Sequence, residues 1–174
     1  TKKFYQIDLR CEKKLKKLLL KIKPGHIFHF AGDCSSTDFE KLLLSHVFST
    51  FALFKVIKEI EGYNPRIIIP SSASEYGRVS RRKASIREDC IPAPVSLYGF
   101  SKMTQTNLSL FFARQGLDVV IARIFNIIGE GVPVSFSIGR FAYELALIRK
   151  KQKSPQLHTK SLDVKRDFLD IHDI

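Results

Sequence analysis

Short apolar runs alternate along this chain with longer segments in which apolar residues recur at helical spacing. The apolar runs are residues 27–32, 67–69 and 119–122, and the longest helical pattern between them covers about residues 37–60. Because no tight hairpin signal joins the runs, each strand must return through a helix, and neighbouring strands are then parallel. The alternation predicts an α/β fold whose parallel sheet is covered by helices on both faces.

Further helices follow from amphipathic spacing. Residues 10–22 place leucines on one face and lysines on the others, and residues 98–115 are followed by Gly116, which is suited to end a helix. A last helix is expected at about residues 138–151. Residues 4–9 are predicted to form a strand that enters in the middle of the sheet.

Tyr98 and Lys102 are four residues apart in the predicted helix 98–115, so their side chains share one face. A phenol has an ordinary pKa of roughly 10, and a nearby ammonium favours the phenolate and so lowers that pKa. A tyrosine in this setting can exchange a proton near neutral pH and act as a general acid or base. The same spacing occurs where a half-buried tyrosine packs on a lysine stem, so the pattern alone leaves both interpretations open.

Hydroxyl side chains come directly after the apolar run 67–69. Ser71, Ser72 and Ser74 occupy what would be the carboxyl end of that strand. Ligands of open α/β sheets bind at this edge. The sequence therefore predicts a binding site there, and the structural alternative is that Ser72 only caps a turn.

Four short motifs occur in order: SSxxxYG from Ser71, YGxSK from Tyr98, RxFNxxG from Arg123 and RDFxDI from Arg166. Together they resemble the extended short-chain dehydrogenase/reductase family, which contains nucleotide-sugar epimerases, dehydratases and 4-reductases. The similarity runs from about Tyr5 to Ile174, and it is greatest to the GDP-6-deoxy-4-keto-mannose reductase branch. The resemblance implies a Rossmann-like, doubly wound parallel sheet.

The glycine-rich turn that holds the cofactor pyrophosphate in this family is not found among the nine glycines. We therefore expect residues 1–174 to form a single partial domain. It would be incomplete at the N-terminus and would lack most of the C-terminal substrate-binding part. Residues from about 125 to 174 are expected to contribute to the substrate-binding side.

The resemblance implies catalytic roles for three residues. Tyr98 would be the general acid on the sugar oxygen, and Ser72 would orient the same oxygen. Lys102 would hold the nicotinamide ribose and lower the Tyr98 pKa. Ser72 and Ser74 are also expected to contact the substrate.

Two residues beyond the apolar run 119–122 match family positions that contact the substrate diphosphate. They are Asn126 and Arg166, and an always-charged, forked guanidinium suits phosphate. The structural alternatives are that Asn126 stabilises a loop and that Arg166 pairs with Asp170.

The cofactor implied by the resemblance is NADP or NAD. Asp8 and Leu9 would border the adenine, Ala31 and Gly32 would line the cofactor site, and Tyr98 with Lys102 would meet the nicotinamide end. No metal is expected, because the histidines and cysteines lack ligand spacing.

Two departures from the family pattern bear on the reaction. Dehydratases need an acid and a base directly after the active hydroxyl, and here Ala73 and Ser74 stand at those positions. Because neither residue serves well as an acid or base, dehydration is disfavoured. Glu75 is displaced by one residue and is expected to point elsewhere. His46 occupies a position where the family often has asparagine.

We therefore expect an oxidoreductase that reduces a 4-keto group of a nucleotide sugar by hydride transfer from NADPH or NADH. A GDP-sugar is favoured as the substrate. The first alternative is a nucleotide-sugar 4-epimerase with bound NAD. The second is a non-catalytic relative that binds a polyanion.

The net charge of +12 arises largely from three basic clusters, in residues 1–23, 78–83 and 149–153. Such clusters attract phosphate groups, but no nucleic-acid-binding motif accompanies them, so nucleic acid is not the expected partner. No apolar stretch is long enough to span a bilayer, and three cysteines without paired spacing fit a reducing cytoplasm. The resemblance also implies a homodimer.

Overall fold

The computed structural model describes residues 3–34, 36–78, 85–159, 163 and 165–174. The chain divides into two compact units, Thr1–Ile124 and Phe125–Ile174. The second unit begins where the region predicted to serve substrate binding begins. The grouping of both units into a single partial domain stays a prediction.

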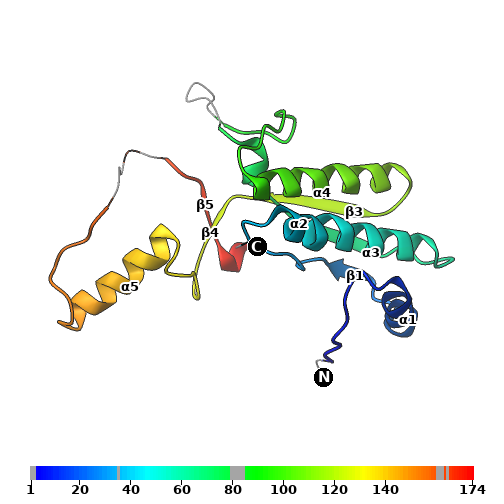
Figure 1. Ribbon diagram of the computed structural model, residues 1–174, viewed down its shortest axis with the longest axis horizontal. Coiled ribbons are helices and arrows are strands. Elements are labelled where there is room, and N and C mark those ends of the chain that lie inside the picture. Colours follow the sequence, from blue (N-terminus) through cyan, green and yellow to red (C-terminus); the bar gives the residue numbers. More distant parts are fainter. Residues whose placement is uncertain (1–2, 35, 79–84, 160–162, 164) are drawn as a thin grey trace. The chain divides into compact units, whose positions relative to one another are not determined.

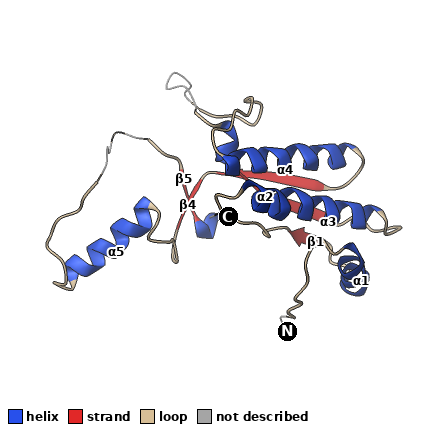
Figure 2. Cartoon of the chain, viewed as in Figure 1, coloured by secondary structure: helices blue, strands red, loops and turns tan. Residues whose placement is uncertain are grey.

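A three-stranded parallel sheet forms the centre of the first unit (Figures 1 and 2). Its strands, in spatial order, are β1 (His26–Phe28), β2 (Arg66–Ser72) and β3 (Val119–Ile124). In the register of the sheet, Ile67 lies opposite Ile27 on one side and Val119 on the other. The predicted α/β arrangement with parallel strands is confirmed.

The helical elements of this unit are α1 (Glu12–Ile22), α2 (Phe39–Leu42), the π-helical turn η1 (Leu43–Phe48), α3 (Ser49–Lys58), the 3₁₀ turn η2 (Ala73–Tyr76) and α4 (Leu97–Arg114). The helix predicted at 37–60 is therefore α2, η1 and α3 in succession. It begins after Asp38, whose carboxylate accepts hydrogen bonds from the backbone of Glu40 and Lys41. The Thr50 hydroxyl donates to the backbone carbonyl of His46, which lies in the π-helical turn η1.

Apolar side chains from α1, α3, β2 and α4 meet in one core. Its fully buried members are Phe54, Val56, Ile57, Ile67 and Ile69, with Leu15, Leu19, Leu53 and Phe112 nearly so. Burial of each such side chain stabilises the fold by about 1.5–3 kcal/mol. The leucine face of α1 and the apolar face of α3 predicted from spacing are the faces that form this core.

The opposite face of the sheet is more exposed than expected. Phe28 and Val120 lie in register on either side of Ile68, and they are 61% and 43% exposed. Side chains alternate between the faces of a strand, so Ile67 and Ile69 point to the other side, where the core helices pack. The described helices thus cover one face, which departs from the expectation of cover on both.

Residues 4–9 do not form the predicted strand in the described part of the chain. A strand needs a hydrogen-bonded neighbour, and this segment instead packs Ile7 and Leu9 against the core as half-buried side chains. That prediction is wrong. Packing of these two residues still places Asp8 beside the sheet.

The second unit contains two short parallel strands and one long helix. They are β4 (Asn126–Ile128), α5 (Ser137–Arg149), β5 (Phe168–Asp170) and the 3₁₀ turn η3 (Ile171–Asp173). The helix predicted at 138–151 is confirmed with slightly earlier bounds. Within the described ranges, no helix is long and apolar enough to cross a membrane.

Candidate active site

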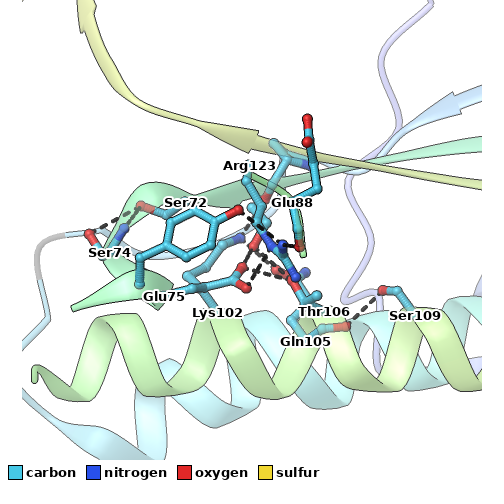
Figure 3. A network of polar contacts seen from close by, with 12 residues as sticks. Ser72, Ser74, Glu75, Glu88, Lys102, Gln105, Thr106, Ser109 and Arg123 are labelled. Carbon is cyan, nitrogen blue, oxygen red and sulfur yellow. Dashed lines mark hydrogen bonds and ion pairs between the residues drawn. The ribbon is translucent and has the colours of Figure 1, made fainter. Parts of the chain in front are cut away.

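The carboxyl end of β2 turns sharply at Ser72. The Ser72 hydroxyl accepts a hydrogen bond from the backbone N–H of Ser74 at 3.2 Å and donates to the Ser74 hydroxyl at 3.1 Å (Figure 3). Ser72 therefore caps η2, as the structural alternative proposed. The same turn brings both predicted substrate-contacting serines together at the edge of the sheet where ligands bind.

The first turn of α4 packs directly on this serine turn. Ser96 caps the helix by accepting from the backbone of Gly99 at 3.0 Å. A Cβ on Gly99 would lie 2.5 Å from the Ser74 carbonyl oxygen, so the approach requires glycine. The contact places the Tyr98 phenol within hydrogen-bonding reach of Ser72.

The Tyr98 pKa moves opposite to the direction predicted from its neighbour at Lys102. Burial raises the pKa above the ordinary 10.0, and the nearby Ser72 hydroxyl lowers it by less. Lys102 is not among the groups that shift the Tyr98 pKa in this structure, and its expected lowering of that pKa stays a prediction. The reason is geometric, because the Lys102 ammonium is bonded to other groups, and desolvation of the phenolate dominates.

Lys102 is buried with only 6% of its surface exposed. Its Nζ donates to the carbonyl oxygen of Pro70 at 2.6 Å and to Oε1 of Gln105 at 2.5 Å. Burial lowers the Lys102 pKa from 10.5 to about 8, and the charge of Glu75 opposes that shift. The side chain is therefore held at the end of β2, one helical turn from Tyr98.

A buried ionic network lies behind the serine turn (Figure 3). Glu75 is fully buried, accepts hydrogen bonds from the hydroxyls of Ser71 and Thr106, and forms an ion pair with Arg123 at 3.2 Å. Arg123 also donates to the Tyr76 hydroxyl and to a loop carbonyl at residue 88. The expectation that Glu75 points away from the reacting group is confirmed. The position of Glu75 in the motif did not indicate its ion-pair partner, because Arg123 lies 48 residues later in the chain.

The buried side chain of His46 packs against the first turn of α4. His46 Nδ1 lies 2.9 Å from the Ser101 hydroxyl, and the His46 ring meets the Tyr98 ring edge-on with centroids 5.6 Å apart. Ser101 donates its own proton to the Tyr98 carbonyl oxygen, so His46 Nδ1 must be the donor to Ser101.

Burial lowers the His46 pKa from 6.5 to about 4, which leaves a neutral ring. The neutral ring keeps Nε2 as an acceptor beside Gly32, where an added Cβ would lie 2.8 Å from it. Sequence reasoning noted His46 only as a departure from the family pattern.

Four of the six predicted cofactor residues line one pocket of about 460 Å³, whereas Tyr98 and Lys102 are not among its lining residues. Asp8, Leu9, Ala31 and Gly32 all contribute to its wall. The Asp8 carboxylate is bound by the Arg10 guanidinium through two hydrogen bonds of 3.0 and 2.8 Å, and these hold the Asp8 pKa at about 2. Arg10 also lines the pocket and was not predicted.

Asn126 and Arg166 lie in the second unit, on paired segments. The Asn126 side-chain amide donates to the carbonyl oxygen of Asp167 at 2.8 Å, so Asn126 does stabilise the strand pair. This pairing sets Asn126 opposite Phe168, and the exposed Arg166 precedes that residue by two positions in the chain. The expected alternative partner Asp170 instead accepts from the backbone of His172.

Comparison with known proteins gives consistent results. A family model described as NAD dependent epimerase/dehydratase family matches residues 1–174. GDP-6-deoxy-D-mannose reductase from Pseudomonas aeruginosa is 31% identical over 156 residues, which cover 87% of this chain and 51% of that protein. dTDP-6-deoxy-L-talose 4-dehydrogenase (NAD(P)(+)) from Kitasatospora kifunensis is 26% identical over 148 residues, or 84% of this chain and 46% of that protein.

Among solved structures, that of RMD from Pseudomonas aeruginosa complexed with NADPH superposes with a TM-score of 0.87 at 30% identity. The match covers 97% of this chain and 57% of that chain. The Rossmann-like fold class is thereby confirmed. This chain spans about half the length of the relatives that it matches.

Proposed function

Because the chain belongs to the NAD dependent epimerase/dehydratase family, we propose that it carries the catalytic residues of a 4-keto nucleotide-sugar reductase. The observation that carries this proposal is the approach of the Tyr98 phenol to the Ser72 hydroxyl at the carboxyl edge of β2, beside the buried Lys102 whose Nζ is held by the Pro70 carbonyl. A relative with reductase activity on a GDP-sugar supports the reaction class. Ala73 and Ser74 supply no acid–base pair for dehydration.

Tyr98 is the proton donor in this proposal. Its raised pKa keeps the phenol protonated at neutral pH, as a general acid for ketone reduction requires. The Ser72 hydroxyl, which donates to Ser74 in this structure, would turn its proton to the same ketone oxygen and fix the position of that oxygen beside the phenol. The proton passes from the Tyr98 hydroxyl to the oxygen as the carbonyl carbon gains a hydride, so that the ketone becomes an alcohol. When bound, a reduced nicotinamide supplies that hydride.

The pocket in the first unit fits the adenosine end of NADP or NAD. Its volume of about 460 Å³ suits part of a dinucleotide, and its wall at Gly32 has no side chain to obstruct a ligand. Asp8, Leu9 and Ala31 would form the remaining wall of the cofactor site. Lys102 would hold the nicotinamide ribose through its ammonium, which is mostly charged at pH 7.

In the second unit, Asn126 and Arg166 are proposed to contact the substrate diphosphate. Arg166 is exposed, and its guanidinium can bind two phosphate oxygens at once. A GDP-sugar is the favoured substrate. A 4-epimerase would use the same Tyr98, Lys102 and Ser72. An activity assay is therefore needed to distinguish 4-keto reduction from 4-epimerisation.

The complete gene product is the sample for that assay. With GDP-4-keto-6-deoxymannose and NADPH, we expect loss of NADPH absorbance in proportion to the deoxysugar formed. Tyr98→Phe should lower turnover by roughly a hundredfold or more at unchanged thermal stability. Tyr63→Phe is the matched control, because its hydroxyl bonds Pro24 outside the site.

Three results would contradict the reductase. Interconversion of a 4-hydroxyl sugar nucleotide without net NADPH loss would identify the epimerase. No turnover together with salt-sensitive RNA binding would favour a polyanion-binding relative, for which α1 offers exposed lysines such as Lys13 and Lys17. Residues 79–83, in the second basic cluster, lie outside the described residues. A Tyr98→Phe variant with full activity would remove the phenol from the mechanism.

We also propose a homodimer through the outer face of α3 and α4. Phe51 and Phe111 are 42% and 54% exposed, and both rings contact Phe112, so they belong to one apolar patch. Phe111→Arg should halve the mass measured by light scattering. Phe4→Arg, at a separate exposed phenylalanine, should leave it unchanged. A monomeric wild-type protein would refute the dimer.

A further inference from the structure

The Lys102 ammonium has three N–H donors and two acceptors among the described residues. The first acceptor, the backbone carbonyl of Pro70, comes from the end of β2 at 2.6 Å. The second is the side-chain oxygen of Gln105, three residues later on α4, at 2.5 Å. Two of the three N–H directions are therefore taken, and one is left for the site.

Gln105 itself is fully buried and cannot rotate freely. Its Nε2 donates to the Thr50 hydroxyl at 2.8 Å, and that hydroxyl donates its own proton to the His46 carbonyl oxygen at 2.5 Å. Thr50 can therefore only accept from Gln105. The amide NH₂ must face Thr50, and the amide oxygen must face Lys102.

His29 strengthens the same orientation from the end of β1. Its Nε2 lies 3.0 Å from the Thr50 hydroxyl, whose proton is already committed, so His29 Nε2 also donates to Thr50. The chain of bonds runs in one direction from Lys102 through Gln105 and Thr50 to a backbone carbonyl. An amide group in this chain keeps its protons, so the chain orients Lys102 and does not conduct protons from it.

We propose that Gln105 is a positioning residue that directs the Lys102 ammonium, so that its remaining N–H is left for the cofactor ribose. This inference rests on the proposed function for its catalytic consequence. The Gln105 oxygen also replaces water around a buried charge. Without that oxygen, the charged form of Lys102 would lose an acceptor and the neutral form would gain in population.

Several titratable groups surround Lys102 from the packed elements. Glu75 on η2, His29 after β1 and His46 on η1 interact with its charge, Tyr98 lies one turn away on α4, and Arg123 on β3 pairs with Glu75. The two histidines have pKa values of about 4, so they stay neutral between pH 6 and 10. The Glu75 charge is paired with Arg123. A titration observed near pH 8 can therefore be assigned to the Lys102 ammonium.

The test measures this titration directly in the complete gene product labelled with carbon-13 at the lysine ε-carbons. Lys102→Arg identifies the signal. Gln105→Met, similar in shape but without the amide, should lower the midpoint by about one pH unit or more. Gln105→Glu keeps an acceptor and adds negative charge, so it should raise the midpoint. Ser109→Ala is the matched control, because the buried Ser109 hydroxyl donates to the backbone carbonyl of Gln105 and, among the described residues, does not contact the Gln105 amide.

Enzyme kinetics supply the second measurement. Gln105→Met should raise the KM for NADPH roughly tenfold, the cost of losing one hydrogen bond to a charged group, whereas Gln105→Glu should retain most of the affinity. An unchanged Lys102 midpoint in a folded Gln105→Met or Gln105→Glu protein would overturn the inference. No hydride transfer by wild type, with both midpoints shifted as stated, would instead refute the proposed function and leave the Gln105–Lys102 coupling standing.

Discussion

His29 should make the folded protein sensitive to mild acid. Its side chain is 4% exposed, and Nε2 is within 3.3 Å of the hydroxyls of both Thr50 and Ser49. Burial, together with the charge of Lys102, lowers the His29 pKa from 6.5 to about 4. The unfolded chain therefore binds more protons than the folded chain between pH 6.5 and 4. Stability is fully present above pH 6.5 and is lost as the pH falls through this window.

The magnitude follows from these two pKa values. Lowering the pH from 7.5 to 5 should reduce the free energy of unfolding by about 2 kcal/mol through His29 alone. His46 has a similarly lowered pKa and adds a loss of the same sign. Lys102 has its pKa at about 8, so it contributes little between pH 7.5 and 5.

Urea unfolding followed by circular dichroism at pH 7.5 and pH 5 measures this loss. In His29→Gln, which does not titrate, the loss between the two pH values should be smaller by about 2 kcal/mol than in wild type. His26→Gln is the matched control, since His26 is exposed on the same segment. An equal loss in His29→Gln and wild type would refute the reasoning.

Two further predictions concern the turn that carries the serines. Glu75→Gln breaks a buried ion pair with Arg123 and should destabilise the fold by about 3 kcal/mol, seen as a fall in Tm of roughly 6–12 °C. The double variant Glu75→Leu with Arg123→Met should recover part of this, and no fall in the single variant would contradict the role of the pair. Gly77→Ala should destabilise by about 2 kcal/mol or more in chemical unfolding, because φ is +64° and the new Cβ would lie 1.8 Å from the Ala93 oxygen. Gly62→Ala shares the positive φ but has open space, so its smaller effect isolates the steric contact, and equal effects would exclude it.

Local spacing was sufficient for most of the helices and for the three strands of the first unit. The helices containing Leu19 and Tyr98 and the strand at Ile67 follow directly from periodicity, because each pattern needs only a few consecutive residues. The strand predicted at residues 4–9 was wrong because that prediction also used only a few consecutive residues. Its composition suits a strand, but a strand exists only where another strand binds it.

In the candidate site, too, some features are visible in the sequence and others depend on tertiary packing. The helical spacing of Tyr98 and Lys102 and the hydroxyl of Ser72 after an apolar run are visible along the chain. The direction of the Tyr98 pKa was not, because it depends on how deeply the phenol is buried and on which atoms bind the ammonium of Lys102. Gln105, three residues beyond the motif, carried no local mark of its contact with Lys102.

The sequence by itself determined the alternation of strands and helices and the identity of the chemical groups at the sheet edge, because both depend on residues close together in the chain. Only the tertiary structure decided which of those groups are desolvated and paired. Glu75 and Arg123 are separated by 48 residues, and Gln105 and Thr50 by 55. Electrostatic energies depend on distance and burial in space, so the protonation states of the site arise only after these distant segments pack together.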